Sequence, residues 1–328
     1  MIVSFDTIMK PPYDLTPTIL GLIKSISEKI GEIQAHTMTK PPLHLRKENR
    51  IKTIQASLSI EGNTLTEDQV TAILDQNRVI GPQKDITEVT NALLAYDQML
   101  KFKSTSIKDF LLAHKILMKG LVVDPGQFRQ KNIGIAKGNR VAHVAPPPRL
   151  VPGLMEKLFF YLQDKTEMNL IKSCVFHYEL EFVHPFSDGN GRIGRMWQTL
   201  ILLEEYPVFE YLPFETLISK SQKKYYQALT QSDKLGKSTP FIEYMLNVID
   251  EALHTLLSAR QKKFTATDRL EHFLKMGPAA FTRLDYMKVF KTISTATASR
   301  DLKMGVEMGW LKKTGHQNKS SYKIGKAR

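Results

Sequence analysis

The chain has 328 residues, a length that favours one large domain together with one small domain. Hydrophobic residues make up 42% of it, charged residues make up 24%, and the formal net charge is +13, which is a globular composition with a basic excess. A single cysteine, Cys174, excludes a disulfide framework and a cysteine-based zinc cluster, and the lack of a signal-like N-terminus or a long apolar run predicts a cytoplasmic protein with no membrane partner.

Helical periodicity dominates the first two thirds of the chain. Apolar spacing predicts a helix over 15–36, ended by Pro41-Pro42, and a second over 46–60, ended by Gly62-Asn63. Thr66 is the expected N-cap of a third helix. Further helices are predicted over residues 87–102, 107–120, 154–167, 170–183, 192–205, 219–232 and 240–262. The large domain should therefore be mainly α-helical.

One stretch, between residues 124 and 152, interrupts the helical pattern. Scattered glycines and the run Pro146 to Pro148 exclude a helix there. Apolar residues alternate between Ile133 and Val144, which predicts a short hairpin that turns at Gly138-Asn139. We therefore expect one β-hairpin beside the helices.

The C-terminal residues, 263–328, have a different character. Helices are predicted over 269–275, 284–290 and 295–308, followed by two strand-like segments at 310–313 and 321–324. Three helices and a two-stranded ribbon form the order of a winged helix-turn-helix.

Charge supports a separate function for this segment. The last 67 residues carry 15 Lys and Arg against 5 Asp and Glu, a formal charge of +10. Such asymmetry indicates a module that meets an anionic partner, so we expect DNA to bind through 263–328. The alternative is a protein-interaction module whose basic surface only aids solubility.

The densest group of functional side chains lies between His184 and Arg195. An apolar helix ends near Val183, and a loop containing Gly189-Asn190-Gly191 leads into the next helix. Glycines at such a junction let backbone N–H groups converge, and the helix start adds positive potential, which predicts an anion-binding site. Arg192 and Arg195, one turn apart, can face the same anion.

Two side chains beside this loop are candidates for binding a metal and for accepting a proton. Asp188 would repel a phosphate unless a cation lay between them, and Mg²⁺ prefers one or two carboxylates plus phosphate oxygens. His184 can accept a proton from a hydroxyl near neutral pH, since an ordinary imidazole titrates at about 6.5. Alone, a histidine at a helix end or a Gly-Asn-Gly turn is usually structural. Together they predict phosphoryl or nucleotidyl transfer.

The string from His184 to Arg195 resembles the Fic motif, HPFx(D/E)GNGRxxR, at every fixed position. The resemblance covers roughly 15–250 and includes Gly126–Arg129, the predicted hairpin and Tyr225–Leu229. It implies a mainly α fold: a Fic-type helical bundle with a short β-hairpin flap, followed here by a small winged helix domain. The expected division is an N-terminal helical region over 1–104, a catalytic core over 105–262 and the winged helix-turn-helix over 263–328.

The same resemblance implies a protein adenylyltransferase. His184 would deprotonate a Ser, Thr or Tyr hydroxyl of a target protein, which attacks the α-phosphorus of ATP and expels pyrophosphate. Asp188 would hold Mg²⁺ on the phosphates, and Gly189, Asn190 and Gly191 would form the anion hole. Arg192 and Arg195 would bind the β- and γ-phosphates.

Other roles follow from the resemblance with less support from the residues. Tyr225 or Tyr226 is a candidate for contacting adenine, with packing an equal alternative for both. The hairpin flap would hold a target segment by main-chain pairing. Proteins of this kind commonly self-associate, so a homodimer is among the expected partners.

An inhibitory motif is expected at the end of the second predicted helix. A glutamate at a helix C-terminus is unfavourable unless a cation lies near, and Glu61 has that position. Ser57, Glu61 and Gly62 match the family motif (S/T)xxxE(G/N), which implies that Glu61 pairs with Arg195 and inhibits the enzyme. In some relatives this glutamate supports removal of AMP, and the sequence leaves both directions open.

Two alternatives remain at this point. The chain could be a DNA-binding transcriptional regulator whose Fic-like core only senses nucleotide, but an intact His184 favours the enzyme because a sensor does not require a base. The transferred group could also be UMP, phosphocholine or phosphate, although the complete phosphate clamp favours AMP from ATP.

Overall fold

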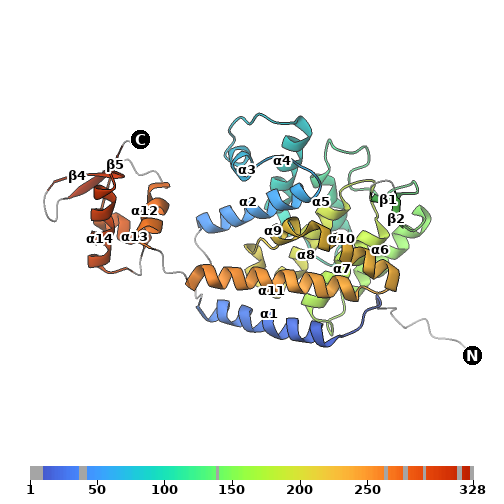
Figure 1. The fold of residues 1–328 in the computed structure, drawn as a ribbon. Coiled ribbons are helices and arrows are strands. Elements are labelled where there is room, and N and C mark those ends of the chain that lie inside the picture. The colour runs from blue at the N-terminus through green and yellow to red at the C-terminus, as the bar shows by residue number, and fades with distance from the viewer. Residues whose placement is uncertain are drawn as a thin grey trace, which may run out of the picture. The chain divides into compact units, whose positions relative to one another are not determined.

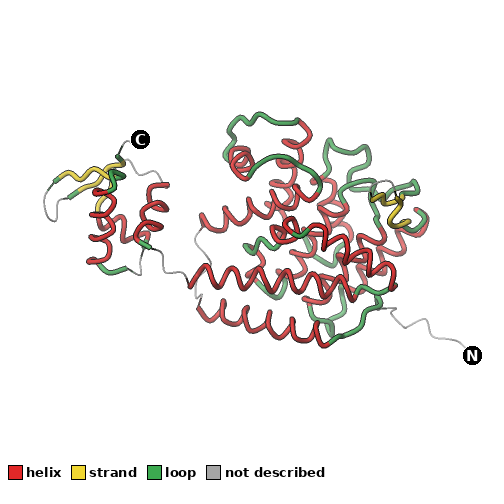
Figure 2. Tube along the Cα trace, viewed as in Figure 1, coloured by secondary structure: helices red, strands yellow, loops and turns green. Residues whose placement is uncertain are grey.

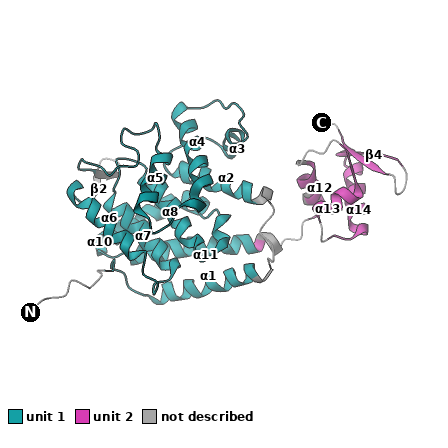
Figure 3. Ribbon diagram, turned by 180° about the vertical axis from the view of Figure 1, so that it is seen from behind, with its two compact units in different colours: residues 1–257 teal, residues 258–328 magenta. Residues whose placement is uncertain are grey.

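The structure, a computed structural model, describes residues 10–36, 43–137, 140–261, 265–275, 280–290, 293–315 and 320–325. The chain divides into two compact units, unit 1 over residues 1–257 and unit 2 over 258–328 (Figure 3). Across the described ranges, no helix combines the length and apolar character that a membrane crossing requires.

Unit 1 is mainly helical, as the sequence predicts (Figures 1 and 2). Its α-helices run in chain order as α1 (Pro17–His36), α2 (Leu43–Ile60), α3 (Glu67–Leu74), α4 (Gln83–Gln98), α5 (Ile107–Leu117), α6 (Val151–Tyr161), α7 (Asn169–Val183), α8 (Asn190–Leu203), α9 (Glu215–Lys220), α10 (Gln222–Leu235) and α11 (Thr239–Gln261). Among the described residues, short 3-10 helices join them: η1 (Met99–Lys101), η2 (Pro148–Leu150) and η3 (Pro207–Glu210).

The predicted hairpin is present. Strands β1 (Gly134–Lys137) and β2 (Arg140–Val144) pair antiparallel, and the register shifts between Ile135 and Ala136. The expected turn at Gly138-Asn139 lies outside the described residues.

Local signals in the sequence set several element ends. Thr66 caps α3 as predicted: its hydroxyl accepts from the Gln69 N–H at 3.3 Å, and the Gln69 side chain accepts from the Thr66 N–H at 3.0 Å. The single helix predicted over 219–232 is wrong, because the backbone leaves the helical region at Ser221 (φ −115°, ψ 31°) and separates α9 from α10.

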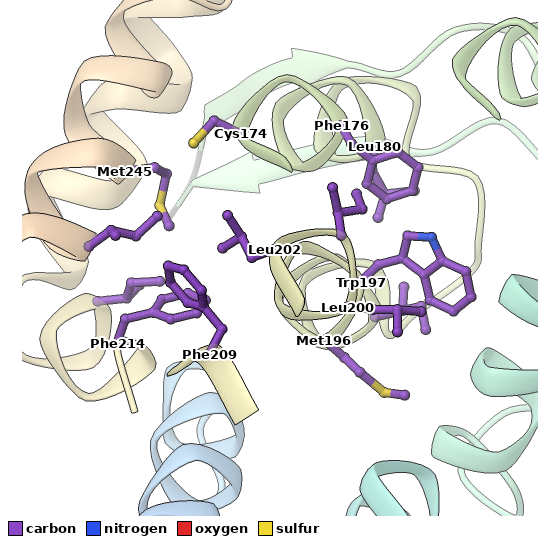
Figure 4. Close-up of a cluster of buried hydrophobic side chains, with 14 of the residues drawn as sticks. Cys174, Phe176, Leu180, Met196, Trp197, Leu200, Leu202, Phe209, Phe214 and Met245 are labelled. Carbon is purple, nitrogen blue, oxygen red and sulfur yellow. The ribbon is translucent and has the colours of Figure 1, made fainter. Parts of the chain in front are cut away.

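The centre of unit 1 is the pair α7 and α8, whose side chains form the buried cluster in Figure 4 together with Phe209, Phe214 and Met245. Trp197 is fully buried there, and its Nε1–H donates to the Ser104 carbonyl at 2.9 Å. Cys174 lies in the same cluster, where burial raises the pKa of its thiol to about 12, so it behaves as an apolar core residue. The His184–Arg195 string joins the end of α7 to the first turn of α8, so the packing of these two helices fixes its position.

Helices α1 and α11 lie side by side along one edge of unit 1 (Figures 1 and 3). Lys29 reaches Asp250 at 2.6 Å, and the Thr16 hydroxyl donates to Glu243 at 2.6 Å. The N-terminal helix is therefore held by the last helix of unit 1, far from it in sequence.

Unit 2 has its own small core. It contains α12 (Ala266–Lys275), β3 (Phe281–Thr282), α13 (Arg283–Val289), α14 (Thr295–Glu307), β4 (Leu311–Thr314) and β5 (Ser321–Ile324), with sheet order β3-β5-β4. The three helices and the β4–β5 ribbon agree with the sequence prediction. Strand β3 was not predicted, because two residues are too few to show an alternating pattern. Buried Asp301 accepts two bonds from Arg269, at 2.6 and 2.9 Å, and ties α14 to α12.

Candidate active site

His184 lies at the C-cap of α7 with a left-handed backbone, φ 48° and ψ 61°, which a non-glycine residue rarely adopts. Buried Arg129 holds that backbone in place. Its Nε–H donates to the His184 carbonyl at 2.7 Å, and its Nη2 donates to the Val183 carbonyl at 3.2 Å and the Pro146 carbonyl at 2.6 Å. A guanidinium at a helix C-terminus is electrostatically favourable, so Arg129 positions the candidate base.

The His184 imidazole lies near the carboxylate of Glu181. Nδ1 of His184 lies 4.0 Å from Glu181 Oε2, and the His184 side chain is 19% exposed, open enough for a hydroxyl to reach it. Burial, followed by the nearby Glu61 carboxylate, raises the pKa of Glu181 to about 7. Sequence reasoning did not identify Glu181.

The two tyrosines considered for adenine binding differ in position. Tyr225 is buried, and its hydroxyl lies 3.1 Å from His177 Nε2 and 3.4 Å from Glu181 Oε1. That places Tyr225 in the core beneath the site, whereas Tyr226 is only partly buried. Of the pair, Tyr226 is the better candidate for contact with a nucleotide.

Asn190 braces the loop through its side chain. The Phe186 N–H donates to Asn190 Oδ1 at 2.9 Å, and Asn190 Nδ2 donates back to the Phe186 carbonyl at 3.0 Å. Phe186 is fully buried, so this pair anchors the loop to the core. Asn190 therefore offers an anion its backbone N–H rather than its side chain.

His114, which the sequence did not single out, supports the same loop from α5. Its Nδ1 accepts from the Gly126 N–H at 2.9 Å, so the proton lies on Nε2, which donates to the Asp188 carbonyl at 2.9 Å. Burial lowers the pKa of His114 to about 4, which keeps the ring neutral. The ring stacks on Phe186 with centroids 3.5 Å apart. His114 thus joins the Gly126 segment to the loop that contains Asp188.

The start of α8 presents backbone N–H groups that are candidates for binding an anion. The first intrahelical bond runs from the Ile193 N–H to the Gly189 carbonyl at 3.0 Å, so the N–H groups of Asn190, Gly191 and Arg192 project from the helix end. A Cβ atom at Gly191 would lie only 2.5 Å from Glu61 Oε1. The carboxylate of Glu61 therefore rests directly against this helix start.

Arg192 and Asp188 form a pair on one side of the loop. Arg192 is 5% exposed and reaches Asp188 Oδ1 and Glu88 Oε1, both at 2.8 Å. Partial burial would raise the pKa of Asp188, but the charge and hydrogen bond of Arg192 outweigh burial and lower it below its usual value. Asp188 is therefore ionised, and its side chain is 49% exposed.

Asp188 fits the Mg²⁺ role as a single carboxylate ligand. Among the described residues, no group of three or more His, Cys, Asp or Glu side chains is arranged to hold a metal. Mg²⁺ commonly binds through one or two carboxylates, with phosphate oxygens and waters completing the shell. The donor set here is compatible with a metal that enters together with a phosphate ligand.

Arg195 is fully buried and lies against the end of α2. Its Nη2 contacts Glu61 Oε1 at 2.7 Å and the Ser57 carbonyl at 3.0 Å, while its Nε donates to Ser57 Oγ at 2.9 Å. Burial opposes the charged form, but the Glu61 carboxylate outweighs it and raises the pKa of Arg195. Nη1 is buried without a hydrogen-bond partner in the part of the chain that the structure describes. Arg192 and Arg195 are thus held by different carboxylates.

We call the bonds of Arg195 with Glu61 and Ser57 the inhibitory contact, after the inhibition that the sequence resemblance predicts. Other bonds hold the end of α2 in place: the Ile60 carbonyl accepts from Gln222 Nε2 at 2.7 Å, and Ser59 Oγ lies 2.9 Å from Ser219 Oγ. Gly62 then turns the chain with φ 90°. The structure brings the three motif residues, Ser57, Glu61 and Gly62, to the start of α8.

Comparisons with known proteins agree on one family. The Fic/DOC family model matches residues 104–202. The crystal structure of a Fic family protein from Desulfovibrio desulfuricans G20 is 38% identical, covers 97% of this chain and 99% of that chain, and superposes with a TM-score of 0.74. A Fic-1 structure from C. elegans, 22% identical, covers 74% of this chain and 73% of that chain with a TM-score of 0.63.

Curated relatives carry an activity in their names. Protein adenylyltransferase fic-1 of Caenorhabditis briggsae is 28% identical over 74% of this chain and 47% of its own length. Protein adenylyltransferase Fic of Drosophila willistoni is 30% identical over 72% of this chain and 48% of its own length. The chain therefore spans about half the length of the curated relatives it matches.

Proposed function

This chain belongs to the Fic family, and from that premise we propose that it is a protein adenylyltransferase that moves AMP from ATP to a Ser, Thr or Tyr hydroxyl of a target protein. The observation that carries the proposal is the placement of an accessible imidazole, His184, beside an anion-binding helix start with the buried donor Arg195. The names of the curated relatives support the same reaction.

The reaction divides among these residues as follows. His184 accepts the proton of the target hydroxyl, whose oxygen forms a bond to the α-phosphorus of ATP as the bond to the β-phosphate oxygen breaks and pyrophosphate leaves. The N–H groups that open α8 and the Arg195 guanidinium bind the phosphate oxygens. Asp188 would hold Mg²⁺, which, when bound, offsets phosphate charge.

We propose further that the inhibitory contact keeps the enzyme inactive. Glu61 occupies the start of α8 and neutralises Arg195, so both anion-binding features are already engaged by the protein itself. ATP phosphates would have to displace that carboxylate or bind in a different pose. Autoinhibition is thus a consequence of one carboxylate competing with phosphate for the same donors.

Labelling with ATP tests the proposal. Wild type, Glu61→Gly and Glu61→Gly/His184→Ala would be incubated with Mg²⁺ and ATP labelled at the α- or γ-phosphate, and modification followed by gel and intact mass. AMP transfer predicts label from the α position alone, strongest in Glu61→Gly and absent without His184. Label from the γ position would identify a kinase. Absence of label despite ATP binding would favour the nucleotide-sensing regulator. Parallel incubations in which a UMP or phosphocholine donor replaces ATP would reveal transfer of those groups as a different added mass.

A second activity, DNA binding by unit 2, is supported by its charge and element order. We propose a winged helix in which α14 enters the major groove, since Arg300 and Lys303 on it are exposed and Lys312, Lys313 and Lys323 are exposed on the ribbon. Fluorescence anisotropy with duplex DNA between 50 and 200 mM salt tests this. Arg300→Gln/Lys303→Gln in the full chain should weaken binding and reduce the salt slope by about 0.9 per lost phosphate contact, whereas Lys24→Gln in unit 1 should not. Salt-independent binding, or none, would leave unit 2 a protein-interaction module.

A further inference from the structure

Glu88 on α4 is a buried carboxylate to which the proposed reaction assigns no role. Its side chain is 5% exposed, and each of its oxygens accepts a hydrogen bond from a different segment of the chain. Oε1 accepts from Arg192 Nη1 on α8 at 2.8 Å, and Oε2 accepts from Asn63 Nδ2, just beyond α2, at 2.9 Å. Lys84 Nζ also lies 3.9 Å from Oε1, but its side chain is 69% exposed, so solvent screens that attraction. The close bonds of Glu88 therefore join α8 to the segment that follows Gly62.

The bond from Arg192 connects Glu88 to the candidate metal ligand. The other terminal nitrogen of Arg192, Nη2, donates to Asp188 Oδ1 at 2.8 Å. Because Arg192 is 5% exposed and a carboxylate accepts from each of its terminal nitrogens, the guanidinium has a defined orientation. Asp188 Oδ1 also accepts from the Gly189 N–H at 2.6 Å, while the Asp188 side chain remains 49% exposed. Glu88 thus orients the guanidinium that in turn orients Asp188.

The bond from Asn63 connects Glu88 to the inhibitory contact. Asn63 follows Glu61 by two residues, and its backbone N–H donates to the Leu58 carbonyl at 3.1 Å, which closes the last turn of α2. The Asn63 side chain is buried, with Nδ2 also donating to the Asp85 carbonyl at 3.1 Å and Oδ1 accepting from the Leu65 N–H at 3.0 Å. The end of α2 is therefore attached to α4 through Asn63, by bonds that do not involve the Glu61 carboxylate.

We propose that Glu88 is a positioning residue for both the reaction and its inhibition. Through Arg192 it orients Asp188, and through Asn63 it holds the segment that places Glu61 on Arg195. A carboxylate can accept at both oxygens, whereas the amide of glutamine offers one acceptor and one donor, so the two bonds together require an acid at this position. The inference rests on the proposed function, because Asp188 and Glu61 have their roles only there.

Asn63→Ala tests the role in inhibition. Thr64 keeps its bonds to Asp85 Oδ2, at 2.9 Å from the backbone N–H and 2.6 Å from Oγ1, so the segment stays attached but is held less firmly. Initial-rate labelling from α-labelled ATP should rise about threefold or more, because a hydrogen bond to a charged group is lost. In the Glu61→Gly background the same substitution should leave labelling unchanged, since no inhibition remains to be released. An equal rise in both backgrounds, or no rise in wild type, would overturn this role.

Asn49→Ala is the matched control for Asn63→Ala. Asn49 lies near the other end of α2, and its Nδ2 donates to the Tyr211 carbonyl at 2.9 Å, so the substitution also removes an amide bond that holds this helix. Labelling by Asn49→Ala should equal that of wild type. Equal activation by the two variants would mean that any weakening of the attachment of α2 releases the enzyme, and would refute a specific role for the bond between Asn63 and Glu88.

Glu88→Ala tests the role in the reaction, in the Glu61→Gly background so that inhibition does not contribute. The probe is α,β-methylene-ATP, in which carbon replaces the bridging oxygen and AMP cannot be transferred, and its affinity is measured by calorimetry with Mg²⁺ or with EDTA. If Glu88 orients Asp188, binding should weaken about fivefold or more with Mg²⁺ and stay unchanged in EDTA. Glu88→Gln, which keeps the volume and one acceptor, should give a smaller weakening and replaces Glu88→Ala if that variant does not fold. Equal weakening in both solutions, or none in either, would overturn this role.

Binding of the analogue separates this inference from the proposed function. If neither wild type nor Glu61→Gly transfers AMP, the proposed function fails, but Glu61 would still compete with phosphate for the start of α8. Asn63→Ala should then tighten binding of the analogue to the otherwise wild-type chain and leave its binding to Glu61→Gly unchanged. Unchanged affinity in every variant would overturn the inference itself, and no binding of the analogue to any of these proteins would overturn both.

Discussion

Replacing Glu61 by glycine tests the inhibitory contact most directly. The carboxylate makes a 2.7 Å charged hydrogen bond to Arg195, which is fully buried, while the Glu61 side chain is 27% exposed. Glycine removes the carboxylate but keeps the bonds from Arg195 to Ser57 Oγ and to the Ser57 carbonyl. The start of α8 and the guanidinium then become available to phosphate.

The size of the effect follows from the geometry. A hydrogen bond between charged groups contributes about 1.5 to 3 kcal/mol, and the partial exposure of Glu61 favours the lower end, about 1.5 to 2 kcal/mol. At 1.4 kcal/mol per factor of ten, the ratio of open to inhibited enzyme rises about 10- to 30-fold. Glu61→Gln keeps a neutral hydrogen bond and should give an intermediate increase of a few-fold.

The assay is initial-rate labelling from α-labelled ATP, combined with thermal melting. Without nucleotide, Glu61→Gly should melt at a lower temperature than wild type, because Arg195 is left buried without its counter-charge. Adding ATP should stabilise the variant more than wild type, since the phosphates replace the lost carboxylate.

A control substitution tests whether glycine near any helix end raises labelling simply by destabilising that end of the helix. Glu205→Gly alters an exposed glutamate just after α8 and should leave labelling unchanged. Equal labelling by Glu61→Gly and wild type would refute the reasoning, as would equal activation by Glu205→Gly.

Four further predictions follow from the structure. His184→Ala should reduce labelling about 10²- to 10⁴-fold and leave the ATP-induced melting shift intact, and loss of that shift would contradict a role as base. Asp188→Asn should raise the Mg²⁺ concentration needed for half-maximal labelling at least 10-fold, measured by titration, and an unchanged requirement would place the metal elsewhere. His114→Ala should lower the free energy of unfolding in urea by about 1 to 3 kcal/mol and reduce labelling, because the Gly126 and Asp188 segments lose the side chain that joins them. The control His254→Ala, at an exposed position, should change neither the free energy of unfolding nor the labelling. Glu215 keeps a proton in the folded chain up to a pKa of about 7, against 4.5 for the ordinary group, so it lowers the free energy of unfolding as pH rises across that interval. Glu215→Gln should remove this component, about 1 to 3 kcal/mol between pH 5 and 8 in urea, and an unchanged pH dependence would contradict the assigned protonation.

Local sequence signals predicted much of the fold. The capping box at Thr66, the Gly62 turn and the helical periodicity each act over a few residues, and the structure shows each of them in place. Helix ends were less certain: the predicted helix over 154–167 in fact spans Val151–Tyr161, because Pro152 suits the first turn of a helix.

The supporting residues of the site could not be predicted, because their partners are far away in the sequence. Arg129 reaches His184 across 55 residues, and Glu88 reaches Arg192 across 104. A single arginine or glutamate in a helix or loop has no spacing that reveals such a partner. The anchoring role of the Asn190 side chain was also not predicted, because its bonds to Phe186 form only once the loop closes.

The position of Gly191 bears on how one helix start could serve both the proposed catalysis and the proposed inhibition. A Cβ atom there would lie 2.5 Å from Glu61 Oε1 and 2.9 Å from Arg195 Nη1, so the missing side chain is what lets an anion rest against the backbone. In this structure that anion is the Glu61 carboxylate, and a phosphate would use the same N–H groups and the same guanidinium. In the proposed mechanism, the inhibitory contact would therefore act by occupying the donors that a phosphate would use rather than by distorting them. Because those donors belong to α8 and not to α2, removing Glu61 leaves them in place, together with His184 and the residues that position it.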